Sequence, residues 1–213
     1  MIIKHALFCS RFTRLLAGIL LLIILRPALA GSQTILVLGD SISAAYGMSL
    51  EQGWVALMGR ELGNTHPDYT IVNASISGET TAGALQRLPA LLEKHQPNFL
   101  IIELGGNDGL RGYPIITLRA NLLGMVEQAR EINAKVILVP MEIPPNYGNR
   151  YTEGFRESYV VVADNTNSTL APFLLAGVAT DPKLMQADGI HPTVEAQPLL
   201  MNNFLPTLLE VMQ

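Results

Sequence analysis

The stretch TILVLGDSISAAYG, residues 34–47, runs an apolar and β-branched segment directly into Gly39, Asp40 and Ser41. A run without polar alternation is typical of a strand that is buried on both faces, as in a parallel sheet. In such sheets, ligands bind beyond the carboxyl ends of the strands. This stretch therefore predicts a buried parallel strand and places Ser41 at the edge of the sheet where function is expected.

Three further apolar runs repeat this pattern and are bounded by Gly, Pro, Asn or Asp: YTIVNA (69–74), NFLIIEL (98–104) and KVILVP (135–140). Patterns with helical spacing occupy residues 54–62, 81–94 and 117–132. We also expect a helix over 151–170, a weaker fifth strand over 172–175 and a terminal helix after His191-Pro192. Repeated β-α units with short connections predict a three-layer α/β/α fold around a parallel sheet.

The first 30 residues have the composition of a secretory signal peptide. Basic residues at positions 4, 11 and 14 precede an apolar run at 15–25, and small residues follow at 28 and 30. A membrane anchor is the alternative, but this run is shorter than the roughly 20 residues that span a bilayer. We therefore predict a signal peptide over 1–30, a periplasmic or secreted protein without stable membrane insertion, and one domain over 31–213.

The charge and motif content of residues 31–213 excludes several functional classes. The four basic residues of the predicted signal peptide leave 10 Lys and Arg against 18 Asp and Glu, a net charge of −8, which argues against a nucleic-acid partner. The single cysteine, Cys9, lies in the predicted signal peptide, so no disulfide is needed. There is no nucleotide-binding glycine motif and no His/Cys cluster. We expect a monomer without metal or cofactor.

Four polar, glycine-rich clusters stand after predicted strands or before the last helix: GDS (39–41), SISGET (75–80), GGND (105–108) and DGIHP (188–192). Each alone is ordinary turn or capping chemistry. Parallel topology, however, brings them to one edge of the sheet.

A serine hydroxyl needs an adjacent base, normally a histidine that a carboxylate orients. His66 and His95 stand near prolines at helix exits, on the amino side of the following strands, where a surface role is the simpler interpretation. His191 belongs to the expected edge, and Asp188 stands three residues before it across a glycine. A tight turn of that length brings a carboxylate to Nδ1, although Asp188 as a helix cap is the plain alternative. Ser41, His191 and Asp188 are thus the candidate nucleophile, base and orienting group.

Acyl transfer also needs preorganised donors for a developing oxyanion. The backbone N–H groups of Ser41 and Gly78 and the side-chain amide of Asn107 are the candidates. Glycine at position 78 permits close backbone approach. A tight loop at Gly78 and an Asx turn at Asn107 are the alternatives.

Four parts of the sequence resemble, in order and spacing, the four sequence blocks of the SGNH, or GDSL-type, hydrolases. They are GDS with Ser41, the glycine Gly78, GGND with Asn107, and DGIHP with Asp188 and His191. Five longer segments look more narrowly like the periplasmic acyl-CoA thioesterase I, lysophospholipase and arylesterase subgroup. They are LVLGDSISAAYG, NASISGETTAGALQRLPALL, ELGGNDGLRG, IPPNYGNRYTEGF and DGIHPTVEAQP. The resemblance implies a flavodoxin-like five-stranded sheet, a Ser–His–Asp triad, an oxyanion hole from the three donors above, and hydrolysis of esters and thioesters through an acyl-enzyme on Ser41. Asp40 is expected to shape the turn by hydrogen bonding.

Loops must supply substrate choice. After Asn107, the loop residues Leu110, Tyr113, Pro114 and Ile115 are candidate acyl-chain contacts in a mobile loop, the alternative being that they pack on the next helix. A second candidate wall is formed by Pro144, Pro145, Tyr147 and Tyr151, although the simpler interpretation of the two prolines is that they end a strand.

Two other functions remain open from the sequence. A carbohydrate O-deacetylase would use the same machinery, but the apolar loop argues against sugar acetates. A non-catalytic periplasmic acyl or lipid carrier fits the apolar loops, but it has no need for Ser41, Asn107 and His191 together. We expect small acyl esters and thioesters as the substrates.

Overall fold

A five-stranded parallel sheet forms the centre of the structure, a computed structural model that describes residues 32–213. The strands are β1 (Gln33–Gly39), β2 (Tyr69–Asn73), β3 (Phe99–Glu103), β4 (Lys135–Leu138) and β5 (Thr169–Leu170). They lie in the order β2-β1-β3-β4-β5, and every neighbouring pair is parallel. This is the flavodoxin-like order, and the predicted three-layer α/β/α fold is confirmed.

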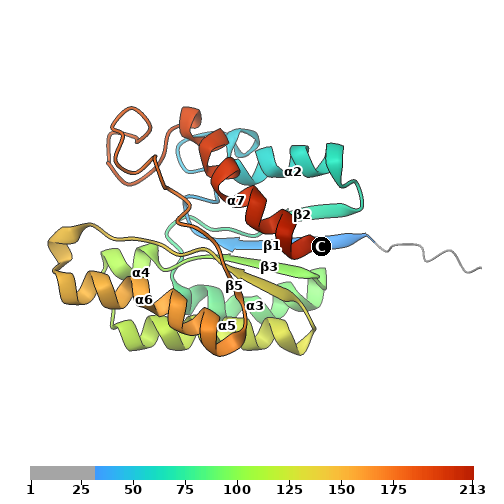
Figure 1. The fold of residues 1–213 in the computed structure, drawn as a ribbon, viewed down its shortest axis with the longest axis horizontal. Helices are drawn as coiled ribbons and strands as arrows, with labels where there is room; N and C mark the ends of the chain where they lie inside the picture. Colours follow the sequence, from blue (N-terminus) through green and yellow to red (C-terminus); the bar gives the residue numbers. More distant parts are fainter. Residues whose placement is uncertain (1–31) are drawn as a thin grey trace, which may run out of the picture. The chain divides into compact units, whose positions relative to one another are not determined.

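Helices cover both faces of the sheet (Figure 1). On one face, α2 (Trp54–Thr65) packs against α7 (Gln197–Met212). On the other, α5 (Ile115–Glu131) lies between α3 (Thr81–His95) and α6 (Asn149–Thr166). Shorter elements are α4 (Gly106–Leu110) and the 3₁₀ turns η1 (Leu50–Gln52), η2 (Pro145–Tyr147) and η3 (Val194–Ala196).

The central strands are buried on both faces, which explains why their sequences lack polar alternation. Side chains of β1 and β3 such as Ile35, Leu36, Leu100 and Ile101 are completely buried. Each such side chain stabilises the fold by about 1.5–3 kcal/mol. Residues Ser32–Gln213 form one compact unit, and no helix within them has both the length and the apolar character needed to cross a membrane.

The fifth strand was predicted at residues 172–175, and this prediction is wrong. Helix α6 ends at Thr166, and Asn167 adopts a left-handed conformation (φ 51°) that turns the chain earlier than expected. Strand β5 then pairs with β4 through Thr169 and Leu170. Leu174 and Leu175 are buried in the turn that follows, so packing rather than strand pairing accounts for their hydrophobicity.

The terminal helix begins later than its predicted position directly after Pro192. Pro192 instead forms an antiparallel bridge with Met185, which closes a loop around residues 185–192. Helix α7 starts at Gln197 with Pro198 in its first turn, where a missing N–H carries no cost. The predicted signal peptide and Cys9 lie outside the described residues, and the expectation of export stays a prediction.

Candidate active site

The turn that follows β1 presents Ser41 at the carboxyl edge of the sheet. Asp40 Oδ1 accepts the N–H of Ile42 at 3.1 Å, and the Asp40 carbonyl accepts the N–H of Ala44 at 2.9 Å. This confirms that Asp40 shapes the turn. Ser41 itself is 9% exposed, so its hydroxyl is close to solvent without being fully open to it.

Ser41, His191 and Asp188 form a continuous chain of side-chain contacts. Ser41 Oγ lies 2.9 Å from His191 Nε2, and His191 Nδ1 lies 2.7 Å from Asp188 Oδ2. An ionised carboxylate can only accept, so Nδ1 carries the proton that is donated to Asp188, and in this tautomer Nε2 can accept from the Ser41 hydroxyl. The three residues that the sequence singled out therefore meet in the order that acyl transfer needs.

The turn between Asp188 and His191 is built to keep the carboxylate charged. Hydrogen bonds from the His191 side chain, the His191 backbone and the Ile190 backbone lower the pKa of Asp188 to about 2. Gly189 has φ +68°, a conformation that glycine adopts without strain. His66 takes no part, since its ring contacts Thr65 and Tyr69 at the other edge.

The candidate oxyanion donors surround the same turn. Asn107, in α4, donates one N–H from Nδ2 to Asp40 Oδ2 at 3.3 Å, which leaves its second N–H for another acceptor. Within residues 32–213, the backbone N–H groups of Ser41 and Gly78 donate to no other protein group. The loop that contains Gly78 is held to the end of β1 by a 3.0 Å hydrogen bond from the Ile76 N–H to the Gly39 carbonyl.

A carboxyl group that the sequence analysis missed, Glu103, lies beneath this turn at the end of β3. Its Oε2 accepts the Ser43 hydroxyl at 2.6 Å and the Asp40 N–H at 3.4 Å, and its Oε1 has no partner among the described residues. Complete burial and the nearby Asp40 charge raise the pKa of Glu103 well above its ordinary range, and burial raises that of Asp40 to about 6. Burial therefore favours the protonated form of Glu103, and of the two carboxyl groups Asp40 has the additional hydrogen bonds, from Ile42 and Asn107, that favour its ionised form. The signal available in the sequence was an acidic residue that closes an otherwise apolar strand.

A second buried carboxylate, Asp108, locks α4 to α3. It accepts the backbone N–H of Thr81 at 2.9 Å and the Thr81 hydroxyl at 2.6 Å, and that hydroxyl also accepts from Asn121 in α5 at 2.9 Å. Thr81 is the first residue of α3, so the carboxylate also meets the positive end of the helix dipole. This network fixes the helix that carries Asn107 against the helix that follows the Gly78 loop.

An apolar pocket of about 640 Å³ opens beside Ser41, Asn107 and His191. Its apolar wall comes mainly from two segments, residues 141–145 and 173–190. The wall includes Leu110, Met141, Ile143, Pro144, Pro145, Phe173, Leu175, Met185 and Ile190. Of the predicted acyl contacts, Leu110 belongs to this lining, whereas Tyr113, Pro114 and Ile115 do not.

The loop expected to be mobile is anchored at two carbonyl groups. The hydroxyls of Tyr147 and Tyr151 donate to the carbonyls of Leu110 and Tyr113 at 2.7 and 2.6 Å. The two tyrosines, predicted as a second substrate wall, stack on each other with ring centroids 6.3 Å apart. With Ile115 they line a separate shallow hollow. In this structure they therefore brace the loop rather than line the pocket beside Ser41.

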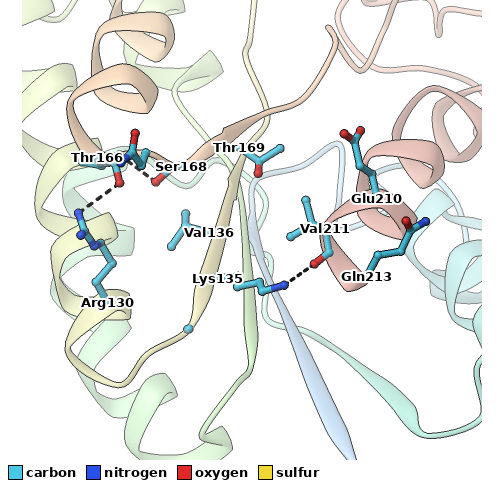
Figure 2. A pocket seen from close by; sticks show the side chains of 11 residues that line it. Arg130, Lys135, Val136, Thr166, Ser168, Thr169, Glu210, Val211 and Gln213 are labelled. Atoms are coloured by element: carbon cyan, nitrogen blue, oxygen red, sulfur yellow. Dashed lines mark hydrogen bonds between the residues drawn. The ribbon is translucent and has the colours of Figure 1, made fainter.

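A further hollow, of about 520 Å³, lies at the opposite, amino edge of the sheet (Figure 2). There the Arg130 guanidinium donates to the Thr166 carbonyl at 3.2 Å and Lys135 Nζ donates to the Val211 carbonyl at 2.7 Å. Both carbonyls lie in the last turn of a helix, α6 or α7, where a cation is favourable. Across residues 32–213, no three His, Cys, Asp or Glu side chains are grouped so as to hold a metal ion.

The fold and this geometry define an α/β protein with a Ser–His–Asp chain at the carboxyl edge of its sheet. Residues 37–198 match the model of the GDSL-like Lipase/Acylhydrolase family, and the chain belongs to this family.

Named relatives agree with the family assignment. Esterase TesA from Pseudomonas aeruginosa is 52% identical over 194 residues, which cover 91% of this chain and 96% of that protein. Thioesterase 1/protease 1/lysophospholipase L1 from Escherichia coli K12 is 41% identical over 181 residues, which cover 85% of this chain and 86% of that protein. The crystal structure of the psychrotrophic esterase EstA from Pseudoalteromonas sp., inhibited by monoethylphosphonate, is similar with a TM-score of 0.82 at 43% identity, over 84% of this chain and 98% of that one.

Proposed function

We propose that this protein hydrolyses carboxylic esters and acyl thioesters through an acyl-enzyme on Ser41. The observation that carries the proposal is the unbroken chain from Ser41 through His191 to Asp188 at the mouth of an apolar pocket. Relatives named esterase, arylesterase and thioesterase support the same reaction class.

In the first step, Ser41 Oγ attacks the carbonyl carbon while its proton moves to His191 Nε2. The Asp188 carboxylate, 2.7 Å from Nδ1, stabilises the imidazolium that forms. The imidazolium then protonates the leaving oxygen or sulfur as the bond to the acyl carbon breaks. Water attacks the acyl-enzyme in the second step, with His191 again taking a proton and returning it to Ser41 Oγ.

The negative charge that develops on the carbonyl oxygen needs N–H donors that are already in place. The second N–H of Asn107 and the backbone N–H groups of Ser41 and Gly78 fill this role in our proposal. Asp40 orients the Asn107 amide, because a carboxylate at 3.3 Å selects the NH₂ end of the side chain. Asp40 is thus a positioning residue rather than a catalytic one.

The pocket lining favours an acyl chain as the bound group. Its wall is mainly apolar, with few groups that could hydrogen-bond a sugar. We assign the acyl contact to Leu110 and to the segments 141–145 and 173–190, in place of Tyr113, Pro114 and Ile115. This makes a carbohydrate O-deacetylase the weaker candidate.

We also infer that the enzyme is exported, loses residues 1–30, and acts as a single-domain monomer without a cofactor. The basic, apolar and small-residue segments of the N-terminus support export. N-terminal sequencing of protein recovered from a periplasmic extract tests this, and an N-terminus at Met1 would contradict it.

Ser41→Ala tests the mechanism, with Ser43→Ala as a matched control from the same turn. Ser43 is buried and bonds Glu103, so its variant is expected to keep activity on aryl acetates while Ser41→Ala loses at least about 10⁴-fold. A fluorophosphonate probe should label the Ser43 variant and not the Ser41 variant. Labelling of Ser41→Ala, or turnover near wild type, would reject the proposal. An unlabelled wild type would point to an acyl carrier.

A panel of aryl esters and acyl thioesters of graded chain length then defines the substrate. We expect acyl chains longer than acetyl to be hydrolysed with lower KM, because the apolar wall is the surface they reach. Faster turnover of acetylated sugars than of any acyl ester would favour the deacetylase instead.

A further inference from the structure

Tyr46 lies five residues after Ser41 and packs directly on His191. The two ring centroids are 4.2 Å apart and the rings are tilted by 31°. Among the described residues, no other aromatic ring lies on His191. His66 is the other histidine of this part of the chain with an aromatic neighbour, and it meets Tyr69 edge-on with ring centroids 6.1 Å apart. The contact on His191 therefore places the electron-rich face of a phenol ring beside the imidazole.

The residue before Tyr46 is held in an unfavourable backbone conformation. Ala45 has φ +57° and Gly47 has φ +79°. A left-handed backbone conformation costs free energy in a residue other than glycine. It persists only where the surrounding structure holds the residue in place. Ala45 is 4% exposed, so its surroundings do so here.

The Tyr46 turn is also tied to the His191 loop by one side chain, Gln186. Its Nε2 donates to the Tyr46 carbonyl at 2.9 Å and to the Pro192 carbonyl at 3.0 Å, and its backbone N–H donates to the His191 carbonyl at 2.7 Å. A Cβ at Gly47 would stand 2.6 Å from Gln186 Oε1, so a larger residue there would have to move the Gln186 side chain. The turn that carries Ser41 and the loop that carries His191 are thereby fixed relative to each other.

We propose that Tyr46 is a positioning residue for His191: its ring holds the imidazole toward Ser41 and stabilises the imidazolium that forms when the Ser41 proton arrives. The face of an aromatic ring attracts a cation, so this contact is stronger in the charged state than in the neutral one. Half of the Tyr46 surface is exposed, and an aromatic ring left in water without a structural need is consistent with such a role. The proposal rests on the proposed function, in which His191 is the base.

The charged groups near His191 are the same in the wild type and in variants of Tyr46. Asp188 contacts Nδ1, and Asp40 lies close enough that His191 lowers its pKa. Ser41 faces Nε2 and Gln186 is uncharged. Replacing Tyr46 leaves these groups in place, so a change in the acidic limb of the pH profile reports on the ring.

The experiment compares Tyr46→Phe with Tyr46→Leu by kcat/KM against pH on an aryl ester. Phenylalanine keeps the ring and is expected to match wild type. Leucine should lower the plateau about three- to tenfold and move the midpoint of the acidic limb to lower pH by about half a unit, because the imidazolium loses its partner. Tyr69→Leu, which removes the aromatic neighbour of His66, is the matched control and should leave both quantities unchanged.

Several results would overturn the proposal. A lowered plateau with an unmoved midpoint would make the contact purely structural, and equal losses in the phenylalanine and leucine variants would assign the effect to the hydroxyl. An unchanged leucine variant would leave Tyr46 without a role. If the leucine variant unfolds, proton NMR titration of His191 compares Ser41→Ala with the double variant Ser41→Ala, Tyr46→Met. The midpoint should be lower without the ring, and an unmoved midpoint would contradict the ring's role. Failure of the proposed function would be recognised by a different result, namely that Ser41→Ala retains activity.

Discussion

At the amino edge of the sheet, Arg130 and Lys135 donate to carbonyls at the ends of α6 and α7, whereas at the carboxyl edge Ser41, His191 and Asp188 bond to one another. The two hollows are similar in volume, about 520 and 640 Å³. What differs is how their polar groups are used. The cations of the amino edge already have backbone partners, while the side chains of the carboxyl edge are arranged around open space.

The direction of the helices explains this difference. In β-α units the helices run opposite to the strands, so their positive N-termini face the carboxyl edge and their negative C-termini face the amino edge. Accordingly, the carboxylate of Asp108 meets the start of α3 at one edge, and Lys135 meets the end of α7 at the other. The polarity of the layers thus favours anions and developing negative charge on the side where Ser41 lies.

After Ser41→Ala, the largest expected effect at the carboxyl edge comes from Asp188→Asn. An amide at this position favours the wrong tautomer of His191, so kcat should fall by about 10⁴-fold. Steady-state kinetics on an aryl acetate measure this. Asp181→Asn is the control, because Asp181 makes a similar turn seven residues earlier in the chain. Its side chain accepts the Lys183 N–H at 2.9 Å and does not bond to His191. A loss below tenfold in Asp188→Asn would contradict the role of Asp188.

Asn107→Ala should lower kcat by about 10²–10³-fold with little change in KM, because the amide acts only on the developing oxyanion. The control from the amino edge is Asn98→Ala. The Asn98 side chain accepts the Thr34 N–H at 2.9 Å, so its loss should affect stability and leave kcat unchanged. Equal kinetic losses in both variants would mean that the two edges do not differ as we describe.

Glu103→Gln should change how stability depends on pH. Because burial raises the pKa of Glu103 in the folded protein, the unfolded chain releases this proton first, and wild-type stability falls as pH rises above about 4.5. Glutamine has no proton to lose. The free energy of unfolding of the variant, relative to wild type, should therefore rise by about 1.4 kcal/mol per pH unit until Glu103 ionises.

Urea unfolding from pH 5 to 8 measures this difference. The exposed Glu61→Gln on α2 is the control and should give a difference that does not vary with pH. A flat difference for Glu103→Gln as well would show that Glu103 ionises normally in the folded protein.

The smallest effects are expected at the amino edge. Arg130→Ala and Lys135→Ala should each lower the free energy of unfolding by about 0.5–1 kcal/mol, since each removes a cation from a helix C-terminus. Activity should stay unchanged. Urea unfolding and aryl acetate kinetics check the two statements, and a tenfold loss of activity in either variant would give the amino-edge hollow a role in the reaction.

Much of the fold followed from local signals in the sequence. Buried strands are apolar throughout, so β1 to β4 could be found from their composition, and the glycine-rich clusters after them marked the carboxyl edge. Ser41, Asp188 and His191 could be named because one tight turn and one parallel topology suffice to bring them together. Helix α5 forms where helical spacing was found over 117–132, and it buries one face with Leu118, Leu122, Met125, Val126 and Ala129.

The acyl wall and the fifth strand depend on packing between segments that are distant in the chain. Phe173, Leu175 and Met185 line the pocket, but their apolar character alone could not distinguish a strand from a turn. The anchoring of the 110–113 loop by Tyr147 and Tyr151 depends on hydroxyl groups that reach carbonyls nearly 40 residues away. Such contacts leave no periodic signal in the sequence.

By itself, then, the sequence determined the layers, the strand order through the family resemblance, and the place of Ser41 at the carboxyl edge of the sheet, because these depend on burial and short turns. Only the tertiary structure decided that Glu103 is buried beneath Asp40, where its pKa is raised, and that Tyr46 lies on His191. Both depend on the distance and burial of groups between 60 and 150 residues apart, and electrostatic interactions change steeply with both.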